Sequence, residues 1–129
     1  MKDDIKDYIQ KWLIKAEHDL LNAQTVVEHN PIILDTACFH CQQAAEKYLK
    51  SFLIHKGVVV EKTHNLHFLL ELCSQHDADF LNIDVKNLND FGVEIRYPDN
   101  FLDPSMQDTK EYLEVVLKIQ KMVLEKINM

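Results

Sequence analysis

The feature that most restricts the fold of this chain is the regular spacing of apolar side chains near its N-terminus. Apolar residues recur there at intervals of three and four positions, namely at Ile5, Ile9, Trp12, Ala16, Leu20, Ala23 and Val27. This spacing places them on one face of an α-helix. The pattern therefore predicts a single long helix from about Asp4 to His29.

Shorter runs with the same spacing predict four further helices. They are expected over about residues 32 or 35 to 56, 63 to 75, 84 to 95 and 103 to 127. Asn30-Pro31 suits the boundary between the first two helices, because Asn caps a helix well and Pro fits its first turn. Gly57 can end the second helix in a left-handed turn, and Thr63 is expected to cap the third.

The chain contains only two Gly and three Pro among 129 residues, so it lacks the turn residues that many short strands require. Residues 58–60 are three β-branched valines, but no second strand of matching character exists to pair with them, and we interpret them as a connecting loop. Long helices joined by short connections favour an up-down bundle. The sequence thus predicts an all-α fold, an up-down bundle of about five helices, in which residues 1–129 form one domain.

The chain is acidic, with a formal net charge of −7 at pH 7 and a pI near 5.4. This balance argues against extensive wrapping of nucleic acid, which needs a broad Lys/Arg surface, but it allows a local phosphate site. No uncharged run approaches the roughly 20 residues of a membrane span, and the acidic N-terminus does not match a signal peptide. We therefore expect no membrane association and a cytoplasmic location. No Gly-rich phosphate loop and no HExxH motif occurs, and no cofactor is expected.

Three cysteines raise the question of a metal site. Cys38-x-x-Cys41 and Cys73-x-x-His76 have the paired spacing of thiolate and imidazole ligands that hold zinc in a tetrahedron. The alternative is that the cysteines are small core side chains, as free Cys commonly is. The alternative is favoured, because zinc ribbons usually place such pairs in turns, whereas Cys38 and Cys41 fall within a predicted helix.

A polar stripe beside the apolar face of the second helix is the best candidate for a ligand site. It consists of His40, Gln43, Lys47 and Lys50, with Glu46 adjacent. All charged residues from 47 to 60 are lysines, and Lys62 and His64 follow shortly, so this end of an acidic chain is locally positive. The stripe therefore predicts contact with a phosphate or an RNA backbone. The alternative is an ordinary solvated helix face.

Asp19 falls within the apolar stripe of the first helix, where an unpaired carboxylate would be costly. Arg96 or a lysine of the second helix is its natural partner. Such a pair could be purely structural, or Asp19 could reach water at the edge of the stripe.

Four segments carry specific residue combinations as well as periodicity. They are Trp12-Leu13-x-x-Ala16-x-x-Asp19-Leu20-x-x-Ala23, Cys38-Phe39-His40-Cys41-Gln42-Gln43-Ala44-Ala45-Glu46-Lys47-Tyr48-Leu49-Lys50, Lys62-Thr63-His64-Asn65-Leu66 and Arg96-Tyr97-Pro98-Asp99. In this order, over nearly the whole chain, they resemble the HEPN family. The resemblance implies a helical bundle, often a homodimer, in small prokaryotic proteins encoded beside a minimal nucleotidyltransferase. Many such proteins act in toxin–antitoxin or defence systems, and a nucleotide-binding role is implied as well.

The ribonuclease branch of that family is marked by an arginine followed, after four to six residues, by a histidine, and the two residues meet across a dimer interface. Arg96 fits the first half of this motif, but no histidine follows it in the chain. Without that imidazole, the proton transfer of RNA cleavage has no obvious agent. Binding is therefore expected rather than catalysis by the familiar route.

The leading prediction is a dimeric HEPN-like module that binds a nucleotide or RNA phosphate, or docks on a nucleotidyltransferase. Its expected ligand residues are Arg96, Tyr97 and Asp99 in the loop, with Gln43, Lys47, Lys50 and His64 opposite. Arg96 would clasp a phosphate or Asp19, and Tyr97 would stack on a base or anchor the core. Two alternatives stay open. One is a metal-independent ribonuclease with a displaced histidine, using Arg96 and His64, and the other is a structural homodimer without a ligand.

Overall fold

The computed structural model describes residues 2–60, 62–92 and 102–128. These residues form four α-helices, which are α1 (Lys2–His29), α2 (Leu34–His55), α3 (Leu66–His76) and α4 (Met106–Ile127). Short 3-10 helices occur at Pro31–Ile33, Ala78–Asn82 and Leu88–Phe91. The described residues contain no strand, so the predicted all-α class is confirmed.

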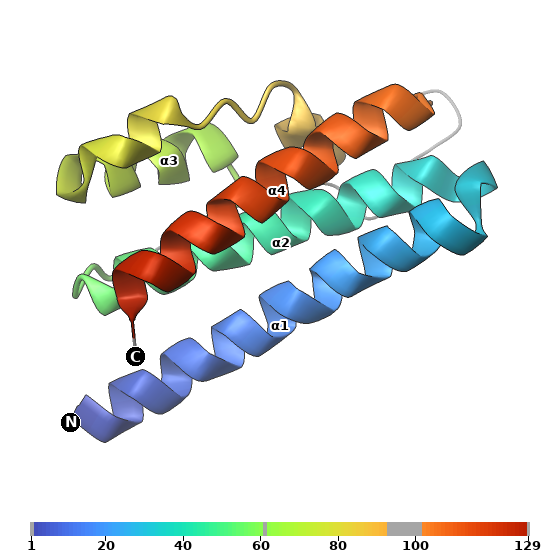
Figure 1. Ribbon diagram of the computed structural model, residues 1–129. Coiled ribbons are helices and arrows are strands. Elements are labelled where there is room, and N and C mark those ends of the chain that lie inside the picture. The colour runs from blue at the N-terminus through green and yellow to red at the C-terminus, as the bar shows by residue number, and fades with distance from the viewer. Residues whose placement is uncertain (1, 61, 93–101, 129) are drawn as a thin grey trace.

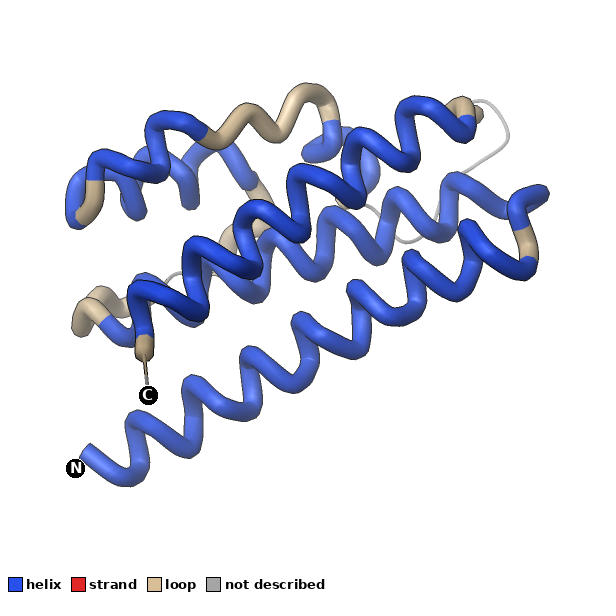
Figure 2. The backbone as a smooth tube through the Cα atoms, viewed as in Figure 1, coloured by secondary structure: helices blue, strands red, loops and turns tan. Residues whose placement is uncertain are grey.

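α2 is the central helix, and each of the other three α-helices packs against it. α1 lies antiparallel to α2, whereas α4 lies beside α2 and runs in the same direction (Figure 1). Figure 2 shows that helix accounts for most of the described chain and that loops are confined to the connections. α2 thus has neighbours on most of its sides.

The core follows the helical spacing of the sequence. From the predicted stripe of α1, Ile9, Ala16, Leu20 and Ala23 are buried, whereas Ile5 is half exposed at 50%. α2 is buried around most of its circumference, and its Phe52 packs against Phe80 with the ring planes tilted and the centroids 4.6 Å apart. α4 covers the remaining side of α2 with Tyr112, Val116, Ile119, Val123 and Ile127.

The helix predicted over residues 84–95 is wrong for its described part. Residues 84–92 contain only the 3-10 helix Leu88–Phe91, and Lys86 has a positive φ of 53°, which a continuous α-helix does not allow. The Tyr112 hydroxyl donates to the Asn87 side chain, and the Asn89 side chain accepts from the backbone N–H of Leu66. These tertiary hydrogen bonds stabilise the turn over residues 84–92. Val85, Leu88 and Phe91, the apolar residues whose spacing suggested a helix, are still buried.

The predicted boundaries are mostly confirmed. α1 ends at His29, and Ser105 opens α4 with a reciprocal capping box to Asp108. Residues 58–60 are a loop whose Val59 is exposed, while the valines on either side pack on the core. The predicted cap of α3 is wrong by two residues, because Asn65 rather than Thr63 accepts from the first turn.

No described helix has the length and the apolar character needed to cross a membrane.

Candidate functional site

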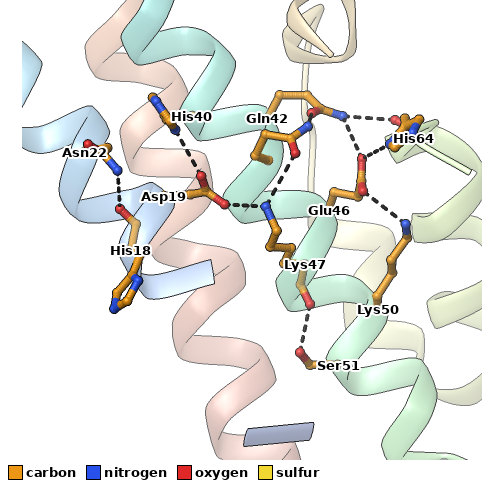
Figure 3. Close-up of polar contacts among 11 residues, drawn as sticks. His18, Asp19, Asn22, His40, Gln42, Glu46, Lys47, Lys50, Ser51 and His64 are labelled. Atoms are coloured by element: carbon orange, nitrogen blue, oxygen red, sulfur yellow. Dashed lines mark hydrogen bonds and ion pairs between the residues drawn. The ribbon is translucent and has the colours of Figure 1, made fainter. Parts of the chain in front are cut away.

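A polar network links α1, α2 and the loop before α3 (Figure 3). Helical spacing places Gln43, Lys47 and Lys50 along one side of α2, as the sequence predicted, with Glu46 between them. α1 adds Asp19, and the loop adds His64. The structure therefore brings four of the predicted ligand residues, Gln43, Lys47, Lys50 and His64, into one connected group.

The first half of the network is centred on the Asp19 carboxylate, whose side chain is only 14% exposed. Its Oδ2 atom accepts from Lys47 Nζ at 2.5 Å, and its Oδ1 atom lies 3.0 Å from His40 Nδ1. A lysine of the second helix is thus the partner that the sequence required for Asp19. These contacts fasten α1 to α2 across an otherwise apolar interface.

Opposing effects act on the pKa of Asp19. Burial alone would raise it, but the hydrogen bonds from His40 and Lys47, together with the charges of those two residues, outweigh burial. The pKa of the Asp19 carboxyl therefore lies below its ordinary value of 3.8. The carboxylate form is favoured by folding.

The second half of the network is centred on Glu46, whose side chain is 5% exposed. Its carboxylate lies 3.0 Å from Lys50 Nζ and 2.9 Å from His64 Nδ1. The Gln42 amide donates to the His64 carbonyl at 3.0 Å and to Glu46 at 3.4 Å. Lys50 is as buried as Glu46, whereas the side chain of His64 remains 70% exposed.

A glutamine pair joins the two halves. The Gln43 amide donates to the Gln42 side-chain oxygen at 2.7 Å, and Lys47 donates to the Gln43 oxygen at 3.4 Å. Each half thus contains a lysine, a carboxylate and a histidine, and the two ammonium charges offset the two carboxylate charges. The stripe that looked positive in the sequence is neutralised from within by Asp19 and Glu46.

The other predicted ligand residues, Arg96, Tyr97 and Asp99, lie outside the described residues. Gly92, the last described residue before them, lies against the network, since a Cβ atom there would be 3.1 Å from the Gln42 amide nitrogen. A larger residue at Gly92 would press on the side chain that bridges both halves.

The three cysteines are core side chains in the described part of the chain. Cys38 Sγ lies 3.4 Å from the Thr109 hydroxyl, and Cys73 Sγ donates to the Leu49 carbonyl at 3.7 Å. Burial raises the pKa of Cys38 to about 11 and that of Cys73 to about 12, and it also raises that of Cys41, so the thiols stay protonated at neutral pH. Among the described residues, no three His, Cys, Asp or Glu side chains are placed to hold a metal ion.

Two cavities adjoin the lysine ends of the network on the side of α1. One, of about 380 Å³, is lined by Tyr8, Lys11, Trp12, Lys15 and Lys47. The other, of about 470 Å³, is lined by Tyr8, Trp12, Lys50, Ile54, Val58, Val59, Val60 and Lys62. None of the described residues that line them is an Asp or a Glu.

Sequence reasoning missed the contribution of α1 to these cavities. Tyr8, Lys11 and Lys15 lie on the exposed side of a long amphipathic helix, where charged and aromatic side chains are ordinary. The role of Gln42 in the network was missed as well, because nothing in the sequence shows that this neutral amide is buried. Only the register of α1 against α2 shows which of these residues lie together.

A model of the HEPN domain family matches residues 9–129. The chain belongs to the HEPN family. It is 26% identical to the Methanocaldococcus jannaschii protein named "Putative toxin MJ1304", over 93% of this chain and 86% of that protein.

Two solved structures are similar to this HEPN domain. The protein TT1696 from Thermus thermophilus matches with a TM-score of 0.68 and 28% identity, over 92% of this chain and 97% of that one. ST0689, an archaeal HEPN homologue, matches with a TM-score of 0.65 and 23% identity over the same shares of the two chains, which shows the fold alone.

The lowered pKa of Asp19 predicts a pH-dependent effect of Asp19→Asn. Because the folded state holds the carboxylate, Asp19 stabilises the protein above pH 4 or so, and this stabilisation is lost as the pH falls through the lowered pKa. We expect the variant to lose about 1–3 kcal/mol of unfolding free energy at pH 7, and the difference from wild type to shrink below about pH 4.

Urea unfolding at a series of pH values measures this difference. Glu114→Gln, at an exposed site on α4, is the matched control and should change little at any pH. A wild-type advantage that is as large at pH 3 as at pH 7 would contradict the assignment.

Proposed function

We propose that this HEPN domain binds a nucleotide or RNA through its phosphates, as the interaction module of a toxin–antitoxin or defence-type system. The observation that carries the proposal is the gathering of lysines around two adjoining cavities, where the paired Lys47 and Lys50 lie beside lysines that have no carboxylate partner among the described residues. Lys11, Lys15 and Lys62 also line these cavities, whose surfaces are mostly apolar, so five lysines gather around them on a chain whose net charge is −7. A local site of this kind suits phosphate, whereas the acidic remainder of the chain repels it.

The network supports binding by fixing two of those lysines. Lysine side chains lose considerable rotamer freedom when a ligand immobilises them. Asp19 holds Lys47 and Glu46 holds Lys50 before any ligand arrives, so part of that entropy cost is met by folding. Each ammonium has three donors, and that of Lys47, whose side chain is 21% exposed, keeps capacity for a phosphate oxygen, whereas the Lys50 side chain is only 6% exposed.

The similarity to a protein named as a toxin supports the biological side of the proposal. A toxin of a paired system must contact a cellular target, and it must also contact the partner that restrains it. A phosphate-binding surface is consistent with either role.

Thermal melting with added ligand tests phosphate binding. AMP, ATP or a ten-nucleotide RNA should raise the melting temperature, since a ligand at 100 times its Kd adds about 2.7 kcal/mol of stability. The shift should decrease as salt is added, and adenosine, which lacks the phosphate, should give much less. If none of the phosphate ligands shifts the melting temperature at low salt, the proposed function is wrong.

A second candidate function, a metal-independent ribonuclease with a displaced histidine, is favoured by the geometry of His64. Its Nδ1 atom faces the buried Glu46 carboxylate at 2.9 Å, which selects the tautomer with a proton on Nδ1. Since the ring is largely exposed, Nε2 could accept a proton from a ribose 2′-hydroxyl. An imidazole oriented by a carboxylate is a common arrangement for general acid–base catalysis.

An RNA cleavage assay in EDTA tests this candidate. If the protein cleaves RNA, His64→Asn should reduce the rate by about 100-fold or more. His67→Asn, which changes an exposed histidine in the first turn of α3, should leave the rate unchanged. A lack of cleavage by the wild type, or equal rates in both variants, would exclude His64 catalysis.

We also propose that the protein forms a homodimer and has a nucleotidyltransferase as its partner. Membership of the HEPN family supports both, and exposed leucines on α1 and α4 offer apolar surface for a protein contact: Leu21, Leu117 and Leu124 are 52%, 41% and 46% exposed. Light scattering should give twice the 15.1 kDa mass of the chain. A single-chain mass at every concentration would contradict the homodimer.

A further inference from the structure

Tyr8 and Trp12 line both cavities, together with five lysines. We call this set the aromatic–lysine surface, and it consists of Tyr8, Lys11, Trp12, Lys15, Lys47, Lys50 and Lys62. We infer that the aromatic–lysine surface binds an unpaired polynucleotide strand, with bases stacked on its rings and phosphates on its more exposed lysines, while the buried Lys50 supports Trp12. The inference rests on the proposed function and specifies its ligand.

The two aromatic rings are arranged to receive bases. Tyr8 and Trp12 are one helical turn apart, with ring centroids separated by 6.2 Å and planes at 89° to each other. The two rings meet edge to face, so each supports the other, and an unpaired base can stack on the ring face that remains open. Tyr8 is 52% exposed, so its ring is accessible to a ligand.

Trp12 is held in place by its surroundings. The Lys50 ammonium lies 5.6 Å from the centroid of the Trp12 ring, within cation–π distance. Lys50 is itself fixed by Glu46, which in turn contacts His64. The polar network therefore orders the ring as well as the lysines.

The cations are distributed along the surface instead of being concentrated at one point. Lys11 and Lys15 are exposed, and within the described residues neither has a carboxylate partner at ion-pair distance. Lys47 lies in one cavity with them, while Lys50 and Lys62 lie in the other. A chain of phosphates that passes over the shared rings can contact the exposed lysines of both cavities, Lys11 and Lys15 on one side and Lys62 on the other.

Other ligands fit the surface less well. Duplex RNA keeps its bases stacked inside and offers no face to Tyr8 or Trp12. An acidic peptide would satisfy the lysines but would leave the rings without flat partners. Single-stranded DNA shares the chemistry of single-stranded RNA, since stacking and phosphate contacts do not need the 2′-hydroxyl.

Trp12 is the one tryptophan of the chain, so its fluorescence reports on this surface directly. We expect a ten-nucleotide single-stranded RNA to change the Trp12 emission saturably. The matching DNA strand should act similarly if stacking and phosphates suffice. AMP and a ten-base-pair RNA duplex should bind at least about tenfold more weakly than the single strand.

Two variants separate stacking from charge, with binding measured by the anisotropy of labelled RNA. Tyr8→Ala removes an exposed ring and should weaken binding by about tenfold. Lys11→Ala combined with Lys15→Ala should reduce the slope of log affinity against log salt by up to about 1.4, as expected for two lost phosphate contacts to a single strand. Lys110→Ala with Lys121→Ala, at exposed positions of α4, removes the same charge elsewhere and should leave that slope unchanged.

The outcomes distinguish the inference from the proposed function. If AMP or duplex RNA binds as well as the single strand, or if Tyr8→Ala and the Lys11/Lys15 variant bind like the α4 control, the inference is wrong while phosphate binding stands. If no phosphate ligand binds wild-type protein, both are wrong. Loss confined to the Tyr8 and Lys11/Lys15 variants supports the inference.

Discussion

The pairing of two buried carboxylates, Asp19 of α1 and Glu46 of α2, with lysine and histidine side chains is the constraint on which the rest of the structure depends. Asp19 and Glu46 are nearly removed from water, and each would be costly without a cation and further hydrogen-bond donors. Lys47 with His40, and Lys50 with His64, meet that need. Because these contacts require one register of α1 and one position of the loop before α3, they fix how the helices meet.

The same constraint bears on where we propose that a ligand binds. A stripe of lysines on α2 suggests an open phosphate site, but its charges are offset from within the fold. Positive charge that is not offset in this way lies farther out, at Lys11 and Lys15 of α1, next to the rings of Tyr8 and Trp12. The network therefore acts as a support that orders Lys47, Lys50 and Trp12, while the ligand is expected on the side of α1.

Much of the fold could be predicted from the sequence because apolar spacing and helix ends are local signals. α1, α2 and α4 follow that spacing. The N-cap of α4 at Ser105 can likewise be predicted from the residues around it. The helix predicted over 84–95 was not correct for residues 84–92, the part that the structure describes, since Asn87 and Asn89 bond to α4 and α3 and Lys86 turns the backbone. Apolar residues in a 3-10 turn can have the same spacing as those in a helix, and tertiary hydrogen bonds decided between the two.

The candidate site was predictable only in part. The need of Asp19 for a partner on the second helix followed from its place in an apolar stripe, and Lys47 is that partner. Gln42 and the cavity residues of α1 gave no such signal, because their importance comes from contacts between helices. The roles of Arg96, Tyr97 and Asp99 remain predictions.

The central claim is that polynucleotide binds on the side of α1, over Tyr8 and Trp12, and the most direct test is to locate the bound strand. Ultraviolet crosslinking of a short single-stranded RNA to the full chain, followed by mass spectrometry of the peptides, gives that location. We expect crosslinks in the α1 peptides that contain Tyr8 and Trp12. Crosslinks confined to α4, or to peptides outside the aromatic–lysine surface, would contradict it.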